Sequence, residues 1–150
     1  MVRRAELADA EAIGRLLHGF NVEFDDVPTP PEQIGERMRE VIAEGSTIVL
    51  LVGDGPDGFV VLRFQPSLST SGLECYLAEL YVVADMRGQG LGRALMEEAI
   101  EVARREGADY IHLGTSEDDV AARALYEKLG FTNREGKPDG PVMYVYEREL

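Results

Sequence analysis

The stretch Val82–Glu106, VVADMRGQGLGRALMEEAIEVARRE, decides how the rest of the chain is interpreted. It reads as the end of an apolar strand, a glycine-rich turn and an amphipathic helix. Gly88, Gly90 and Gly92 let the backbone turn tightly and approach a ligand without obstruction by a Cβ atom. A helix opens with N–H groups that no helical carbonyl accepts, and these donors bind anions together with the helix dipole. The stretch therefore predicts a phosphate site.

Two arginines, Arg87 and Arg93, add fixed positive charge to the rim of this turn. The spacing argues against two common phosphate loops. A nucleoside-triphosphate loop needs GxxxxGK followed by Ser or Thr, and the sequence has no such string. A dinucleotide fingerprint needs GxGxxG after the first strand of its domain, but Arg93 stands at the third glycine position and the turn lies past mid-chain.

The remaining pattern is Arg/Gln-x-x-Gly-x-Gly/Ala, and it follows a strand that ends in LYV. This pattern resembles the coenzyme A pyrophosphate loop of the GNAT superfamily of N-acetyltransferases. A second motif, AARALYEKLGF at Ala121–Phe131, resembles the A-x-x-L-Y-x-x-x-G-F signature of the same superfamily. The resemblance covers essentially the whole chain and implies acetyl-CoA as cofactor. It implies that the pyrophosphate is held by Arg87, Gly88, Gln89, Gly90, Leu91, Gly92 and Arg93.

The second motif carries the first catalytic candidate, Tyr126. In the family, the tyrosine of this helix lies near the coenzyme sulfur and protonates the leaving thiolate, since a phenol within hydrogen-bond reach can donate to it. A packing residue on an amphipathic helix is the alternative. The motif departs from the family at Asp119, where many members have an asparagine that helps to hold the coenzyme. A carboxylate has no amide donor, so Asp119 is not a predicted ligand.

The second catalytic candidate is Glu79, in the strand before the glycine turn. Strand alternation places Tyr81 on its face, while Leu80 and Val82 point to the other. The resemblance implies that Glu79 assists proton loss from the acceptor amine as a general base, often through water. A carboxylate that is structural or orients the substrate is an equal alternative. The resemblance also implies that backbone groups near Leu80 and Val82 pair with the acetyl-pantetheine arm, and that an N–H at a strand bulge polarises the thioester carbonyl.

In this family the acceptor site is built mainly by the first two helices and the loop that joins them. Phe24, Asp25 and Asp26 lie there, and aromatic and acidic groups together suit a protonated amine, as in a polyamine, an aminoglycoside or a basic peptide end. A solvated acidic loop is the alternative. We therefore predict direct transfer of acetyl to a primary amine of a small molecule or peptide, in a ternary complex. A non-catalytic acyl-CoA-binding or regulatory domain is the alternative function.

Composition limits the other classes of function. A chain of 150 residues predicts one domain, 1–150, and a net charge of −13 argues against nucleic-acid or anionic-membrane partners. Apolar runs such as Ile48–Val52 are too short to cross a bilayer, and no basic-then-apolar leader opens the sequence, so a cytoplasmic location is expected. One cysteine and two histidines give no metal-binding spacing, so no metal is predicted. Cys75 lies in an apolar strand and is predicted to be a buried filler.

Hydrophobic periodicity predicts a mixed α/β chain in the order β-α-α-β-β-β-α-β-α-β-β. The resemblance implies the GNAT fold, a mixed, mostly antiparallel sheet of about seven strands flanked by four helices. Helices are predicted at about 10–24 (capped by Asp9), from a capping box at Thr29–Glu32 to Gly45, at 91–105, and at about 118–129 (capped by Ser116). Strands are predicted at 2–5, 48–52, 59–64, 74–83, 110–113, 131–134 and 143–147. The strand at 142–146 could pair across a homodimer or complete the sheet of a monomer.

Overall fold

The computed structural model describes residues 1–24 and 27–150. These residues form two compact units, Met1–Ile111 and His112–Leu150. The first unit holds nearly all of the sheet and three of the four α-helices of the described residues, and the second holds the fourth α-helix. The predicted mixed α/β architecture with four helices is confirmed. The organisation of 1–150 as one domain stays a prediction.

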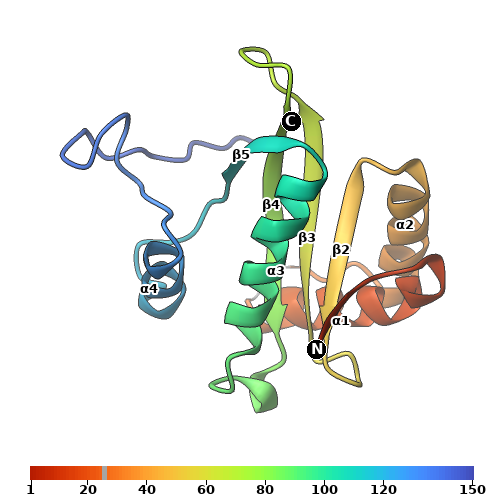
Figure 1. Ribbon diagram of the computed structural model, residues 1–150. Helices are drawn as coiled ribbons and strands as arrows, with labels where there is room; N and C mark the ends of the chain where they lie inside the picture. Colours follow the sequence, from red (N-terminus) through yellow and green to blue (C-terminus); the bar gives the residue numbers. More distant parts are fainter. Residues whose placement is uncertain (25–26) are drawn as a thin grey trace. The chain divides into compact units, whose positions relative to one another are not determined.

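The sheet has five strands in the order β1-β2-β3-β4-β5 among the described residues (Figure 1). The strands are β1 (Val2–Arg4), β2 (Thr47–Val52), β3 (Gly58–Pro66), β4 (Leu73–Val82) and β5 (Ala108–His112). The helices are α1 (Ala10–Glu23), α2 (Pro31–Glu44), α3 (Leu91–Arg105) and α4 (Val120–Lys128), with 3₁₀ turns η1 (Leu7–Asp9) and η2 (Ala84–Met86). β1 to β4 pair antiparallel, each with the next. The chain therefore passes from a four-stranded meander through η2 into α3.

Helices cover both faces of the sheet, with α1 and α2 on one face and α3 on the other (Figure 1). All six residues of β2 are buried for this reason. Alternation sends Val49 and Leu51 into the core under α1 and α2, so Leu50 points to the α3 face. The core on the first face consists mainly of Ile13, Leu16, Ile34, Met38, Val49, Leu51, Phe59, Val61 and Tyr81. The buried stripe of α3 is Leu95, Met96, Ala99, Val102 and Ala103.

Helix ends follow the sequence signals in part. Gly45 ends α2 in the left-handed conformation, with φ +98°, as predicted. The capping box predicted at Thr29–Glu32 is wrong, because Pro30 is the N-cap of α2 and no side chain caps this end. Pro31 occupies the first helical position, where its missing N–H leaves one donor fewer to satisfy. Asp9 precedes α1, but its carboxylate accepts hydrogen bonds from Arg3 and from the Glu6 N–H instead of capping that helix.

The second unit departs most from the prediction. Asp119, and not Ser116, caps α4, since its carboxylate accepts from the Ala122 N–H at 3.2 Å. The two closing strands predicted at 131–134 and 143–147 do not form, so the described residues contain five strands and not about seven. One isolated antiparallel bridge, Arg134 to Val142, stands in their place. Pro141 carries no N–H, so it cannot donate to a longer ladder beside that bridge.

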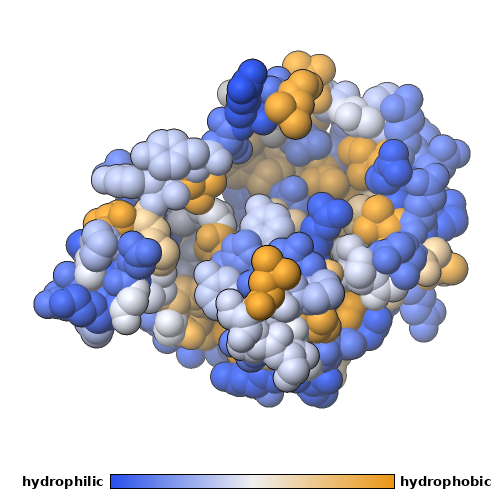
Figure 2. All heavy atoms as spheres, turned by 90° about the horizontal axis from the view of Figure 1, so that it is seen from above, coloured by the Kyte–Doolittle hydropathy of each residue, from blue (hydrophilic) through white to orange (hydrophobic). Residues whose placement is uncertain are grey.

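Most of the face drawn in Figure 2 is hydrophilic, as the composition predicts, with scattered apolar residues. The C-terminal segment 142–146 exposes its apolar side chains, with Tyr144 75% and Tyr146 90% accessible. A homodimer through this segment stays a prediction. No helix in the described part of the chain combines the length and apolar character that a membrane crossing requires.

Close packing of α1 against α2 depends on Gly14. A Cβ atom at Gly14 would lie 2.5 Å from the backbone oxygen of Pro31, whereas one at Gly35 would meet no atom closer than 3.4 Å. We expect Gly14→Ala to lower the free energy of unfolding by about 2 kcal/mol, because the helix backbones must move apart. Gly35→Ala is the matched control and should change it by less than about 1 kcal/mol. Urea unfolding of both variants tests this, and equal stabilities would contradict it.

Candidate active site

The glycine-rich turn has the backbone that the sequence predicts. Gly88 and Gly90 both adopt the left-handed conformation, with φ +78° and +81°, and Gly90 is the N-cap of α3. A Cβ atom at either position would meet nothing within 4 Å, so the space beside the turn is open. The N–H groups of Leu91, Gly92 and Arg93 open the helix and have no carbonyl of a preceding turn to bind. The geometry suits an anionic group at this helix end.

The two arginines of the motif, in contrast, are both engaged by carboxylates of the chain. Arg93 donates through Nε to Glu97 at 2.8 Å, one turn further along α3. Arg87 donates through Nη2 to both carboxylate oxygens of Glu23, at 2.8 and 2.7 Å. Its Nε donates to the Val82 carbonyl oxygen at 2.9 Å. The positive charge that Arg87 and Arg93 could offer to a pyrophosphate is therefore already partly compensated by Glu23 and Glu97.

A β-bulge in β4 lies beside the candidate base. Val61 pairs with Glu79 and Leu62 pairs with Leu77, so Ala78 is the extra residue. Glu79 and Tyr81 share the face of Val61 and Phe59, toward α1, as the predicted alternation of Glu79 with Tyr81 requires. Leu80 pairs with Val60 and is half-buried toward α3. Before the bulge, the odd-numbered residues of β4 face α3, and after the bulge they face α1.

The end of α1 forms an aromatic and charged cluster with β4. The Phe20 ring lies 5.0 Å from Phe24 and 5.2 Å from Tyr81, measured between ring centroids. The Tyr81 hydroxyl donates to Glu23 at 3.3 Å, and burial, followed by the nearby Glu23 charge, raises the pKa of the Tyr81 phenol. The Phe24 ring, which is the last of the three aromatic rings Tyr81, Phe20 and Phe24, is 57% exposed. Asp25 and Asp26, the other predicted acceptor residues, lie outside the described residues.

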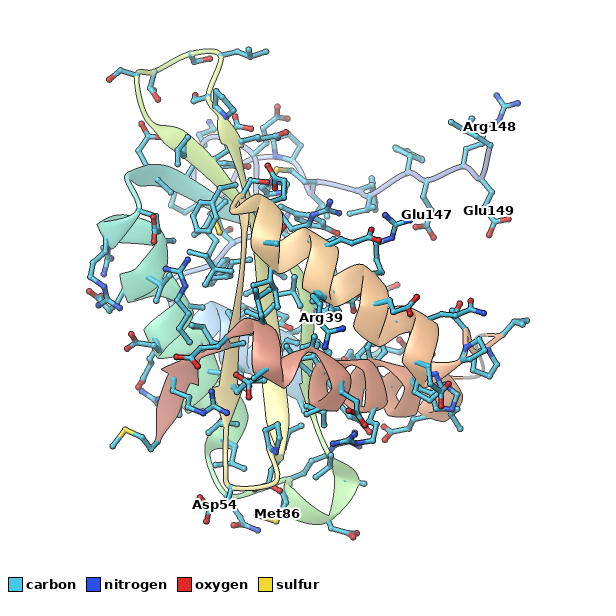
Figure 3. The ribbon with its side chains drawn as sticks, turned by 90° about the vertical axis from the view of Figure 1, so that its right-hand side faces the viewer. Arg39, Asp54, Met86, Glu147, Arg148 and Glu149 are labelled. Carbon is cyan, nitrogen blue, oxygen red and sulfur yellow. The ribbon has the colours of Figure 1, made fainter. Side chains whose placement is uncertain are left out.

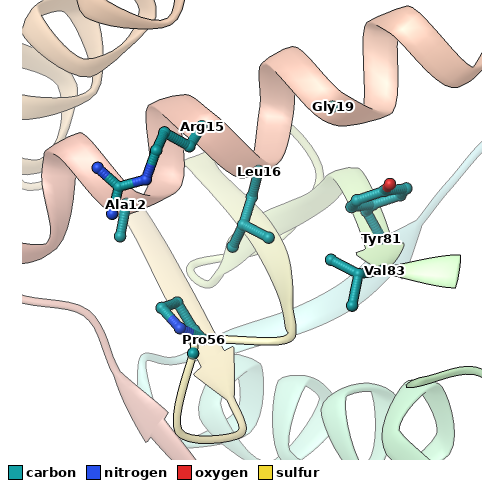
Figure 4. A pocket seen from close by; sticks show the side chains of 8 residues that line it. Ala12, Arg15, Leu16, Gly19, Pro56, Tyr81 and Val83 are labelled. Carbon is teal, nitrogen blue, oxygen red and sulfur yellow. The ribbon is translucent and has the colours of Figure 1, made fainter. Parts of the chain in front are cut away.

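A cavity of about 150 Å³ opens next to this cluster (Figure 4). Arg15 and Leu16 of α1, Pro56 of the β2–β3 turn, and Tyr81 and Val83 at the end of β4 line it. The β2–β3 turn and η2 lie at one end of the sheet, where Figure 3 labels Asp54 and Met86. A hydrogen bond from the Val83 N–H to the Asp57 carbonyl at 2.9 Å joins the two segments. This end of the first unit therefore gathers the glycine turn, the end of α1 and a cavity.

Tyr126 lies in the second unit, on α4, and is half-buried. Its ring packs edge-on against Phe131, with 6.1 Å between centroids. Burial raises the pKa of the Tyr126 phenol, and the negative charge of Asp119 adds to the shift. A raised pKa keeps the hydroxyl protonated at neutral pH, which is the state that a proton donor needs.

Cys75 is fully buried in β4, as predicted. Burial raises the pKa of its thiol to about 11, so the thiolate form that attacks a thioester is scarce at neutral pH. The geometry favours packing for Cys75 and disfavours a covalent acetyl-enzyme.

From the sequence, Glu23 falls with Asp25 and Asp26 in the acidic region expected to hold the acceptor, but sequence analysis did not assign Tyr81 to the site or pair Glu23 with Arg87. Glu23 is more than 50 positions from both Tyr81 and Arg87 in the sequence. Only the antiparallel register of the sheet and the packing of α1 against it bring these residues together. The only available signal was the acidic residue at the end of the helix that precedes Phe24. A pattern of local spacing cannot show that this carboxylate meets Arg87.

Comparison with known proteins identifies the family. Residues 12–131 match the model of the acetyltransferase (GNAT) family. The chain belongs to this family. It is 33% identical over 111 residues to a mycothiol acetyltransferase of Beutenbergia cavernae, covering 68% of this chain and 36% of the relative. It is 29% identical to an aminoglycoside N(6')-acetyltransferase of Stenotrophomonas maltophilia, covering 89% and 87% of the two chains.

Solved structures agree with this assignment. A protein of Arthrobacter sp. FB24 described as an acetyltransferase superposes with a TM-score of 0.91 at 36% identity, covering 100% of this chain and 96% of the other. The chain spans between a third and about half of the length of the curated relatives first matched, 36% and 56% in two cases. Acetyl-CoA is the acetyl donor of this family, and the open helix end after Gly90 fits its pyrophosphate.

The turn itself can be tested through Gly90. We expect Gly90→Ala to raise the Kd for coenzyme A about tenfold, because a Cβ atom fills the space beside the N–H groups and the left-handed backbone becomes strained by about 1 kcal/mol. Gly45→Ala, at a similar positive φ in another turn, controls for strain alone. Isothermal titration with coenzyme A should show weaker binding only for Gly90→Ala. Equal Kd values for the two variants would contradict the site.

Proposed function

We propose that the protein is an acetyl-CoA-dependent N-acetyltransferase that acts on a primary amine of a small molecule or peptide. The observation that carries the proposal is the GNAT family match over residues 12–131 together with the open, left-handed turn at the start of α3. The curated relatives reported above are named a mycothiol acetyltransferase and an aminoglycoside N(6')-acetyltransferase, and another is named an N-alpha-acetyltransferase, of Schizosaccharomyces pombe. The reaction is common to them and the acceptor differs.

In the proposed mechanism, the acceptor amine attacks the thioester carbonyl directly in a ternary complex. Backbone N–H groups of the turn bind the pyrophosphate, and the backbone around Leu80 and Val82, beside the bulge at Ala78, pairs with the pantetheine arm. Glu79 accepts the amine proton, directly or through water, and Tyr126 donates a proton to the coenzyme thiolate. The buried, protonated Cys75 supports direct attack.

The acceptor is proposed to be cationic and to bind at the end of α1. Phe24 offers an exposed ring there, and Glu23 supplies a carboxylate on the same turn of the helix. Asp25 and Asp26 follow directly in the sequence and would add negative charge. The cytoplasm is the proposed location.

An acceptor screen tests the proposed function. The protein is incubated with acetyl-CoA and spermidine, kanamycin or a peptide with a free α-amino group, and products are read by mass spectrometry for the gain of one acetyl group. Release of the coenzyme thiol is followed in the same reactions. Amine-dependent acetylation supports an enzyme, whereas coenzyme A binding without thiol release from any amine would indicate the non-catalytic domain instead.

Tyr126 can be tested by removing its hydroxyl. We expect Tyr126→Phe to lower kcat about 100-fold with the Kd for acetyl-CoA unchanged, because the leaving thiolate loses its proton donor. The raised pKa of Tyr126 means that wild-type kcat should persist through mildly alkaline pH and fall only above the ordinary tyrosine range. Tyr144→Phe, an exposed tyrosine of the same unit, is the control. Wild-type turnover in Tyr126→Phe would remove the assignment.

Glu79 can be tested with an isosteric amide. We expect Glu79→Gln to lower kcat/KM about 100-fold near neutral pH and to make the rate rise with pH, because only the unprotonated fraction of the amine can then react. Glu74→Gln is the matched control on the same strand, because Glu74 accepts a hydrogen bond from Gln65 at 3.2 Å and lies at the end of β4 that is far from the turn. Full activity of Glu79→Gln across the pH range would decide against the base assignment.

A further inference from the structure

Four contacts fix the guanidinium of Arg87 inside the first unit. Two are the hydrogen bonds from Nη2 to the carboxylate of Glu23, at 2.8 and 2.7 Å, and the third runs from Nε to the Val82 carbonyl oxygen at 2.9 Å. The fourth is a stacking contact, with the guanidinium carbon 5.5 Å from the centre of the Tyr81 ring. The Tyr81 hydroxyl donates to the same carboxylate at 3.3 Å. Arg87 and Glu23 therefore neutralise each other beside an aromatic ring.

This cluster joins two parts of the site. Glu23 is the last residue of α1 and directly precedes Phe24, on the proposed acceptor side. Arg87 directly follows η2 and lies three residues before Gly90, the N-cap of α3. The side chains are 44% and 31% exposed for Arg87 and Glu23, so the pair is partly shielded from solvent. A charge pair held at this position fixes the end of α1 against the start of the coenzyme turn.

The geometry also reduces what Arg87 can offer to a phosphate. Its donors at Nε and Nη2 are committed, and its charge is balanced at contact distance by a carboxylate. A pyrophosphate at the helix end would have to displace Glu23 from it, while the backbone N–H groups of the turn are available without any such exchange. We propose that Arg87 is a positioning residue for the acceptor side, acting through Glu23 and Tyr81, and is not a side-chain ligand of the coenzyme.

This inference rests on the proposed function and makes opposite predictions from the ligand interpretation. If Arg87 positions Glu23, then Glu23→Gln and Arg87→Gln should give the same result. Each should raise KM for the amine about tenfold with kcat within about threefold of wild type, and each should leave the Kd for coenzyme A within about threefold. The double variant should be no worse than Glu23→Gln alone, because Arg87 acts on the acceptor through Glu23.

If Arg87 were instead a phosphate ligand, the two variants would act in opposite directions. Glu23→Gln would free the cation, tighten coenzyme A binding and steepen its salt dependence, while Arg87→Gln would weaken binding about tenfold. Arg87→Lys separates the two models further, since lysine keeps the charge but lacks the forked geometry and the Nε donor. It should behave like Arg87→Gln in KM for the amine, and wild-type behaviour would overturn the proposal.

The experiment uses calorimetry of the full chain with coenzyme A at two salt concentrations, and steady-state kinetics with the amine that wild type acetylates fastest in the screen above. Tighter coenzyme A binding in Glu23→Gln, or tenfold weaker binding in Arg87→Gln with an unchanged KM for the amine, overturns the positioning assignment. Wild-type protein that binds coenzyme A but acetylates no amine is a failure of the proposed function, and the calorimetric comparison still decides how Arg87 acts. Urea unfolding of each variant confirms that the comparison is made between folded proteins.

Discussion

The bulge at Ala78 is the constraint on which the arrangement of the first unit depends. Before it, Cys75 and Leu77 pair with residues of β3 that face α3, and after it Tyr81 pairs with Phe59, which faces α1. An uninterrupted strand would keep all three odd-numbered residues on one face, because side chains alternate with period two. The extra residue transfers the odd-numbered side chains from the α3 face to the α1 face. Without it, Tyr81 could reach neither Glu23 nor Arg87.

The glycine turn carries two kinds of group that can bind an anion, the backbone N–H groups and the guanidinium of Arg87, and their surroundings differ. The backbone N–H groups at the start of α3 remain at an open surface, because Gly88 and Gly90 place no side chain there. The guanidinium of Arg87 is drawn back toward β4 and α1 by Val82, Tyr81 and Glu23. Backbone dipoles are fixed by the helix and need no reorganisation on binding, whereas a paired side chain must give up its partner first. The motif supplies both groups, and the surrounding fold determines which one is available.

Local patterns in the sequence predicted most of the first unit. The bounds of α3 follow from its apolar stripe and from Gly107, and the residues of β2 follow from a continuous apolar run. Family resemblance supplied the coenzyme and the expected bulge. The failures come from interactions between distant residues or from competing local bonds. Asp9 looks like a helix cap, but Arg3 and the Glu6 N–H hold its carboxylate and lower its pKa to about 2. The strands predicted near Arg134 fail because an apolar, β-prone sequence forms a ladder only where a partner strand can pair along its length.

The same distinction explains why the acceptor side is harder to deduce than the coenzyme side. A diphosphate can be bound by backbone geometry, and backbone geometry is encoded locally by glycines and a helix start. Selection of an amine needs side chains that come from separate elements, and the residues proposed for the acceptor side come from the end of α1 (Glu23 and Phe24) and from β4 (Tyr81). A charge pair that is only partly shielded from solvent contributes little to stability, so its main effect here is to position the two side chains that form it. In the proposed function, the backbone of the turn therefore serves the coenzyme, whereas the side chains of Glu23 and Arg87 serve the acceptor.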